Sequence, residues 1–232
     1  MKLIILLLLA GTVTLGATAQ KKVTVPDFKL IEKNINDKNS PFYYKTLLDR
    51  YQSNDTLLNE EEYRHLYYGF TFQPSYSPYG TSELVKKLKP LLEKENMSRE
   101  DVRAAIDLEK GILKEYPFNL RNIQTLYRLY GKVQDSLNAR LNFRKLIDLA
   151  QALLSSGTGL SDTSPVYVIS VSHEYDLLSM MGYASAGQAV VKKNGATLDK
   201  LTLEKNDDAV EAMYFNVDLL FASMEKMFRK KD

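Results

Sequence analysis

The spacing of hydrophobic residues changes once along this chain, at the loop Ser-Ser-Gly-Thr-Gly of residues 155–159. Before the loop, hydrophobic residues recur at the three- and four-residue intervals of amphipathic helices. After it, short β-branched runs alternate with turn residues. The change predicts an α+β fold with a helical part over about residues 27–156 and a β-rich part over about residues 165–232.

The predicted helices begin at residues that can cap them. Asp27 precedes the first amphipathic stretch and is a plausible N-cap. Asn59 is followed three positions later by Glu62, and Ser98 by Asp101, which is the capping-box pattern. These signals predict helices over residues 27–36, 42–51, 59–70, 81–95 and 98–116, with Pro90 kinking or splitting the fourth.

Residues 117–154 carry a more specific helical pattern. Leu126 and Tyr130 are four residues apart, as are Ala139 and Phe143, and the interval between the two pairs fits a turn between antiparallel helices. The spacing resembles a tetratricopeptide helix pair. Gln134 stands at a position where such repeats usually have glycine, so repeat descent and an ordinary helical hairpin both stay open.

The β-rich part contains a strong hairpin signal. The dipeptide Asn194-Gly195 separates two runs of strand-forming residues and suits the tight turn of a hairpin. We expect a small antiparallel sheet followed by a C-terminal helix. Its predicted elements are strands over residues 166–171, 188–193, 196–203 and 210–217, and a helix over residues 218–228.

The N-terminus has the pattern of a secretory signal peptide. Lys2 precedes a continuous apolar run, and Ala17 and Ala19 form an A-x-A cleavage site. A retained membrane anchor is the alternative, but the apolar run is short for a bilayer span. We therefore predict a signal peptide at residues 1–19 and a single exported domain at residues 20–232, periplasmic or secreted, with no stable membrane anchor after cleavage.

Composition narrows the possible partners. The chain contains no cysteine, so neither a disulfide nor lipid attachment through a thiol is available after export. Its formal net charge is +2, and loss of Lys2 with the signal peptide lowers it to +1. Because such a balanced chain has no strong basic field, we expect no nucleic-acid partner. We also expect no cofactor, and a monomer or a weak oligomer.

The two histidines suggest one possible catalytic site. His65 follows Glu62 by three positions, and His173 lies beside Glu174 after a predicted strand. If the fold brought them together, His65 and His173 would be candidate metal ligands and His173 and Glu174 candidate catalytic residues of a metal-assisted hydrolase. The sequence lacks the H-E-x-x-H zinc signature, because Leu177 stands four residues after His173. Structural or surface histidines are the alternative.

An aromatic block suggests a binding surface instead. Eight of the fifteen tyrosines lie between residues 43 and 79, and two prolines interrupt the block after residue 73. Rigid aromatic rings suit recognition of a peptide or a sugar, although the same rings can pack the loop onto the helices. We expect non-catalytic binding of a protein or peptide through a helical groove or this loop. The candidate binding residues are Arg64, His65, Tyr67, Tyr68, Phe72, Tyr76 and Tyr79.

Several segments together resemble one known family. The chain is similar to domain-of-unknown-function family 4919 over nearly all of residues 20–232, most specifically in the tyrosine-rich block. The resemblance implies export from a Gram-negative bacterium and a single domain, and it implies no particular chemistry. The segments that carry it are EYRHLYYG at residues 62–69, QP at 73–74, PFN at 117–119, SSG at 155–157, ISVSHEY at 169–175 and YFN at 214–216.

Overall fold

The structure is a computed structural model that describes residues 23–229. The predicted signal peptide lies outside the described residues. The chain divides into two compact units, which we treat separately: a helical unit, Asp27–Ala152, and a β-rich unit that contains residues 23–26 and the chain from Leu153 onward. The α+β fold class is confirmed. The boundary falls two residues before the predicted loop at residues 155–159.

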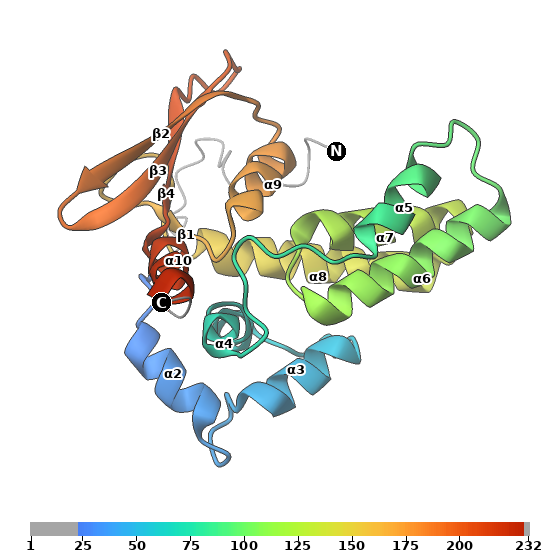
Figure 1. The fold of residues 1–232 in the computed structure, drawn as a ribbon, viewed down its shortest axis with the longest axis horizontal. Helices are drawn as coiled ribbons and strands as arrows, with labels where there is room; N and C mark the ends of the chain where they lie inside the picture. The colour runs from blue at the N-terminus through green and yellow to red at the C-terminus, as the bar shows by residue number, and fades with distance from the viewer. Residues whose placement is uncertain (1–22, 230–232) are drawn as a thin grey trace, which may run out of the picture. The chain divides into compact units, whose positions relative to one another are not determined.

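The helical unit consists of helices joined by short loops, with one longer aromatic loop before α5 (Figure 1). Helix α4 passes directly into a 3-10 turn, η1, at the start of that loop. The final helix, α8, extends two residues past the unit boundary. The elements are α2 (Phe28–Asn36), α3 (Tyr44–Gln52), α4 (Glu60–Gly69), η1 (Phe70–Phe72), α5 (Val85–Leu92), α6 (Arg99–Glu115), α7 (Leu120–Lys132) and α8 (Ser136–Leu154).

The predicted caps are confirmed. The Asp27 carboxylate accepts a hydrogen bond from the backbone N–H of Leu30 at the start of α2. Both predicted capping boxes form, one before α4 and one before α6. Helix α5 is shorter than predicted, because residues 83–84 form a turn before it and it ends at Leu92; Pro90 lies inside a single helix. Local capping chemistry therefore sets where these helices begin.

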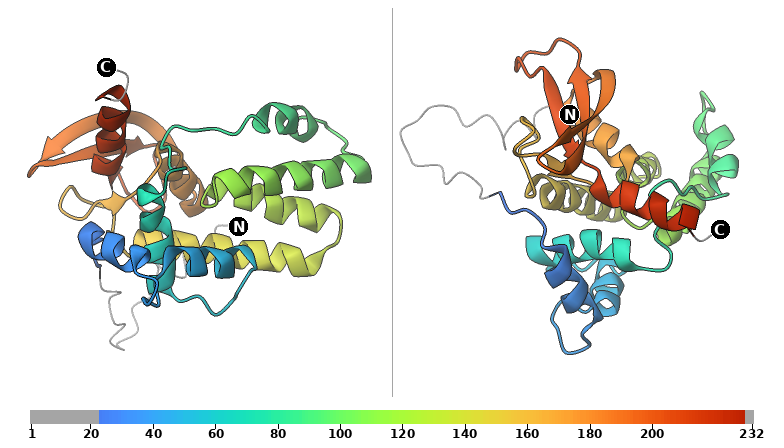
Figure 2. Two further views of the ribbon diagram at one scale, coloured as in Figure 1. Left: turned by 60° about the horizontal axis from the view of Figure 1, so that its bottom comes forward. Right: turned by 60° about the vertical axis from the view of Figure 1, so that its left-hand side comes forward.

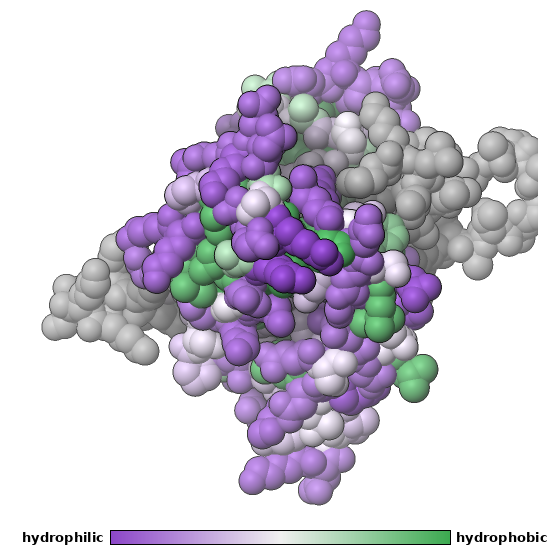
Figure 3. All heavy atoms as spheres, turned by 90° about the vertical axis from the view of Figure 1, so that its right-hand side faces the viewer, coloured by the Kyte–Doolittle hydropathy of each residue, from purple (hydrophilic) through white to green (hydrophobic). Residues whose placement is uncertain are grey.

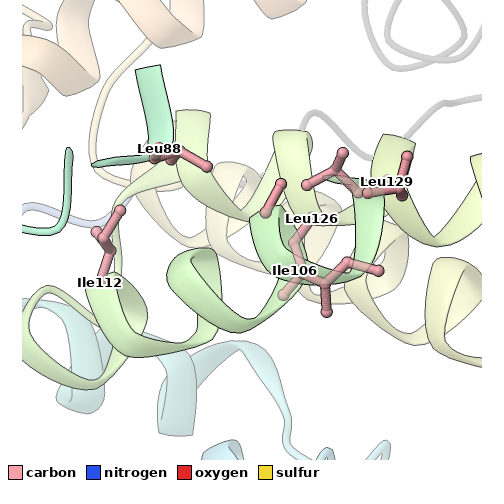
Figure 4. Close-up of a cluster of buried hydrophobic side chains, with 7 residues drawn as sticks. Leu88, Ile106, Ile112, Leu126 and Leu129 are labelled. Carbon is pink, nitrogen blue, oxygen red and sulfur yellow. The ribbon is translucent and has the colours of Figure 1, made fainter. Parts of the chain in front are cut away.

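A hydrophobic cluster joins α5, α6 and α7 (Figure 4). Leu88 comes from α5, Ile106 and Ile112 from α6, and Leu126 and Leu129 from α7; all five are at most 7% exposed. Removing buried aliphatic side chains from water is the main favourable term in such packing. The cluster fixes α6 and α7 against each other.

Helices α7 and α8 form the predicted antiparallel hairpin. The turn between them places Gln134 at φ 62°, in the left-handed region that glycine adopts most easily. Asp135 then accepts the backbone N–H of Asn138 in the first turn of α8. The rings of Tyr127 and Phe143 lie 5.3 Å apart across the pair. Figures 1 and 2 show α6, α7 and α8 running beside one another.

The β-rich unit contains a four-stranded mixed sheet in the order β1-β4-β3-β2. The predicted hairpin is confirmed, with Asn194 and Gly195 at φ 52° and 81° in its turn. One pair, β1 with β4, is parallel, so the sheet is not wholly antiparallel as predicted. The elements are β1 (Val166–Tyr167), α9 (Val171–Met181), β2 (Ser185–Lys193), β3 (Ala196–Leu203), β4 (Ala212–Asn216) and α10 (Asp218–Arg229).

The predicted strand over residues 166–171 is wrong beyond its first two residues. Val166 and Tyr167 pair with the last two residues of β4, which ends at Asn216. The backbone N–H of Val168 still donates to the oxygen of Asn216 at 3.4 Å, the residues after Val168 have no partner strand in the described sheet, and Val171 begins α9. His173 and Glu174 therefore lie in the first turns of a helix and not at the end of a strand.

The surface in the view of Figure 3 is mostly hydrophilic, and hydrophobic residues show only in small groups. Within residues 23–229, no helix is both long and apolar enough to span a membrane.

Candidate functional site

His65 lies inside the helical unit. Its Nδ1 is 2.9 Å from the backbone oxygen of Glu61, and its Nε2 is 3.0 Å from Nδ2 of Asn34. The imidazole stacks on Phe42 with 3.8 Å between ring centroids. Burial lowers its pKa, which favours the neutral ring. Because both ring nitrogens are engaged within the unit, His65 offers no free nitrogen to a metal in this arrangement.

The polar and aromatic residues beside His65 on α4 are also buried. Arg64 is 3% exposed, and Tyr67 and Tyr68 are fully buried. The Arg64 guanidinium lies 5.7 Å from the centroid of Tyr68, and the two tyrosine rings contact each other edge to face. Tyr67 also packs against Phe118. These side chains pack the interior of the unit and do not present a surface.

The loop that follows α4 is more open. Phe72 and Tyr76 are half-buried, and Tyr79 is 49% exposed. The Tyr76 ring packs edge to face on Phe70, so one of its faces is used within the unit. Of the seven candidate binding residues, the structure places three in this loop near solvent and four in the core of the helical unit.

His173 and Glu174 lie in the β-rich unit, on the buried face of α9. Burial lowers the pKa of His173 to about 3 and raises that of Glu174 to about 9, to which the charge of Asp199 on β3 also contributes. Glu174 is fully buried, and Asp199 accepts a hydrogen bond from the Gln188 amide of β2. A glutamic acid that stays protonated at neutral pH cannot serve as a general base.

The candidate metal ligands thus lie in different units. His65 belongs to the helical unit and His173 to the β-rich unit. Across residues 23–229, no three histidine, aspartate or glutamate side chains form a group that could hold a metal ion.

The β-rich unit carries a hollow of about 430 Å³ beside β3 and β4. Its charged lining residues are Lys200 and Glu211, which are of opposite sign, and the Lys200 ammonium lies 5.8 Å from the ring centroid of Tyr214. The hollow therefore has no net charge among its lining residues. Its lining favours neither an anion nor a cation.

The helical unit contains a cleft of about 210 Å³ between the end of α3 and helices α6, α7 and α8. The cleft combines apolar side chains, carboxamides, tyrosines and three lysines. Its lining contains no aspartate or glutamate. The lining residues are Tyr51, Gln52, Asn54, Lys110, Leu113, Lys114, Pro117, Ile123, Leu126, Tyr130, Asn138, Asn142 and Lys145.

Lys145 differs from the other lysines of this cleft because its ammonium is partly buried. Its ammonium donates a hydrogen bond of 2.8 Å to Oδ1 of Asn54 and lies 4.2 Å from the ring centroid of Tyr51. The Tyr51 ring is held in place because its hydroxyl donates to the backbone oxygen of Pro117 at 2.9 Å. Burial lowers the pKa of Lys145 from 10.5 to about 8. A charged group kept partly dehydrated beside a cleft is typical of functional sites.

The predicted turn at residues 53–55 supports this lysine. Asn54 adopts φ 60°, a left-handed conformation that asparagine tolerates better than most residues. Its backbone N–H donates to the backbone oxygen of Tyr51, in the last turn of α3. The turn thereby holds the Asn54 side chain beside Lys145.

This cleft was not predicted from the sequence. One signal was present: Asn138, Asn142, Lys145 and Leu149 follow the four-three-four spacing of a single helix face, and Leu149 is fully buried. Polar residues in line with a buried leucine indicate a face that passes from the core into a polar cleft. Without the positions of α3 and α6, the pattern does not show what lies opposite.

The chain matches one known protein family. A family model described as Domain of unknown function (DUF4919) matches residues 29–226. The chain belongs to this family. The match covers both units of the DUF4919 chain and confirms the resemblance seen in its tyrosine-rich block. No curated protein and no solved structure matches it.

Proposed function

We propose that this DUF4919 chain is an exported, non-catalytic binding protein that takes a protein or peptide segment into the cleft of the helical unit. Export rests on the signal-peptide pattern of residues 1–19. Binding rests on one observation, the cleft lined by three lysines, carboxamides and apolar side chains with no acidic residue. Such a mixture of an apolar floor and a few convergent polar groups is typical of ligand sites.

The shape of the cleft favours a segment over a free small molecule. Its volume of about 210 Å³ lies below the range of about 300–1,000 Å³ usual for pockets that enclose a whole small ligand. Half-buried Leu113 supplies most of the apolar contact area, and Leu126 and Ile123 lie beneath it, 5% and 0% exposed. Part of a longer chain would fill this space while the remainder lies along the helices.

Filling the cleft tests the proposal. Leu113 is half-buried on α6, and Leu113→Trp would occupy the cleft; Leu57→Trp is the matched control, because Leu57 is 82% exposed and does not line it. The probe is a pool of fluorescein-labelled random hexapeptides, followed by fluorescence anisotropy. We expect the wild-type chain and Leu57→Trp to bind the pool and Leu113→Trp to lose binding. Equal binding by a correctly folded Leu113→Trp variant would refute the cleft as the site.

A further inference from the structure

The Lys145 ammonium has an unused hydrogen-bond donor. An ammonium carries three N–H groups. One donates to Asn54, and the Tyr51 ring covers another side of the group. Within residues 23–223, Lys145 makes no ion pair with a carboxylate. The structure therefore holds a partly dehydrated cation at the cleft with room for one more acceptor.

Two further lysines add positive charge at the same place. Lys110 and Lys114 are one turn apart on α6, line the cleft and are exposed. Neither makes an ion pair with any described residue. With three lysines and no acid, the lining carries three positive charges, which favour an anionic ligand.

The amides on α8 distinguish between kinds of anion. The Asn138 amide donates to Asp135 and the Asn142 amide donates to the backbone oxygen of Asn138. Their side-chain oxygens accept no hydrogen bond from the described part of the chain. These oxygens suit an anion that also carries donors: a peptide has several backbone N–H groups, whereas an inorganic phosphate dianion has a single O–H.

The C-terminal residue of a polypeptide carries all the matching groups. It has a carboxylate for the lysines, an amide N–H for the asparagine oxygens and a side chain for the apolar floor. An internal aspartate or glutamate also has a carboxylate, but its chain continues in both directions and needs more space than the end of a chain. Building on the proposed peptide binding, we propose that the cleft captures the C-terminal residue of a partner polypeptide, with the terminal carboxylate on Lys145 and an apolar last side chain against Leu113 and the exposed edge of Leu126.

Three sets of labelled hexapeptides test this assignment by fluorescence anisotropy on the purified chain. The first set ends in Leu, Ile, Val, Phe or Met with a free carboxylate. The second has the same sequences as C-terminal amides, and the third is amidated with one internal Glu. We expect the free acids to bind at least about tenfold more tightly than either amidated set, because a hydrogen bond to a charged group contributes more than a neutral one.

The Lys145→Met variant isolates the anchoring cation. Met keeps the length of the aliphatic stem and removes the charge. Lys87→Met is the matched control, because Lys87 is an exposed lysine of the same unit that does not line the cleft. We expect Lys145→Met to weaken the free acids at least about tenfold and to leave the amides unchanged, while Lys87→Met alters neither.

The remaining outcomes separate the two proposals. Equal binding of acids and amides, lost in Leu113→Trp, would keep peptide binding and overturn C-terminal recognition. Tighter binding of the set with internal Glu would assign the cleft to acidic side chains and overturn it as well. Absence of binding by every set would overturn both proposals.

Discussion

Lys145 in the helical unit and Glu174 in the β-rich unit are both ionisable groups that burial pushes toward their neutral form. Their surroundings differ. Lys145 lines a cleft, has one hydrogen-bond partner and faces no carboxylate among the described residues. Glu174 is fully buried against Asp199 and lines neither the cleft nor the hollow. A displaced pKa therefore indicates a binding site only where a ligand can reach the group.

The comparison also separates two physical roles. A bound anion would neutralise the charge of Lys145. Ligand binding would therefore offset the free-energy cost of keeping this ammonium partly dehydrated. Glu174 has no exposed surface, and the proton that it keeps leaves no buried negative charge to compensate. The first group is suited to recognition and the second to holding α9 on β3 at neutral and acidic pH.

The largest effect is expected from Glu174→Gln at alkaline pH. The folded pKa of Glu174 is raised from 4.5 to about 9, so the folded state binds more protons than the unfolded state between these values. Stability contributed by protonated Glu174 is therefore present below pH 4.5 and is lost as the pH rises toward 9. Glutamine stays neutral, so the variant should exceed the wild type by about 3 kcal/mol or more in free energy of unfolding at pH 9 and match it at pH 4.5.

Hydrogen exchange read at residues 171–203 as a function of pH measures this difference in the β-rich unit. Residues 99–145 of the helical unit serve as an internal reference and should exchange alike in both proteins. A constant difference between the variant and the wild type from pH 4.5 to pH 9 would show that Glu174 ionises normally and would remove the contrast with Lys145.

A smaller effect of the same origin is expected from Lys145→Met. The folded pKa of Lys145 is lowered from 10.5 to about 8, so between these values the unfolded state binds more protons and the stability of the wild type rises with pH. At pH 7 the buried ammonium is a cost, and the variant should be about 1–2 kcal/mol more stable. The gain should shrink toward zero as the pH approaches 10.

Urea unfolding followed by circular dichroism at pH 7 and pH 10 measures this gain. Lys87→Met is the control and should stay within about 0.5 kcal/mol of the wild type. A variant that is more stable but binds its ligand more weakly shows the trade-off expected of a binding residue. A loss of stability at pH 7 would make Lys145 a structural residue.

The same contrast explains what the sequence could predict. The helix caps at Asn59 and Ser98 and the hairpin turn at Asn194-Gly195 depend on residues close in sequence, and all three are confirmed. Lys145 meets Asn54 across 91 positions, so only the packing of α3 against α8 reveals their contact. Such long-range contacts depend on tertiary packing, and local sequence patterns do not predict them.

The sequence could not show which tyrosines lie in the core and which at a binding surface. Tyr67 and Tyr68 suit a core and a binding surface equally well, because tyrosine has an apolar body and a polar tip. Their fully buried positions on α4 follow from the partners that surround them, such as Phe118 and Phe28. The strand predicted at residues 166–171 failed for a similar reason, since strand length depends on the partner strand, and β4 ends at Asn216.

The smallest effect is expected from metal removal. Thermal melting of the purified chain should give the same midpoint with EDTA, with added zinc and in plain buffer, because a bound metal stabilises only the state that holds it. Both ring nitrogens of His65 are engaged within the helical unit, and burial keeps His173 neutral inside the β-rich unit. A midpoint that falls with EDTA and recovers with zinc would contradict this expectation. The same melting experiment would then be made on His65→Gln and His173→Gln. Loss of the zinc response in both variants would favour the metal-assisted hydrolase over binding at the lysine-lined cleft.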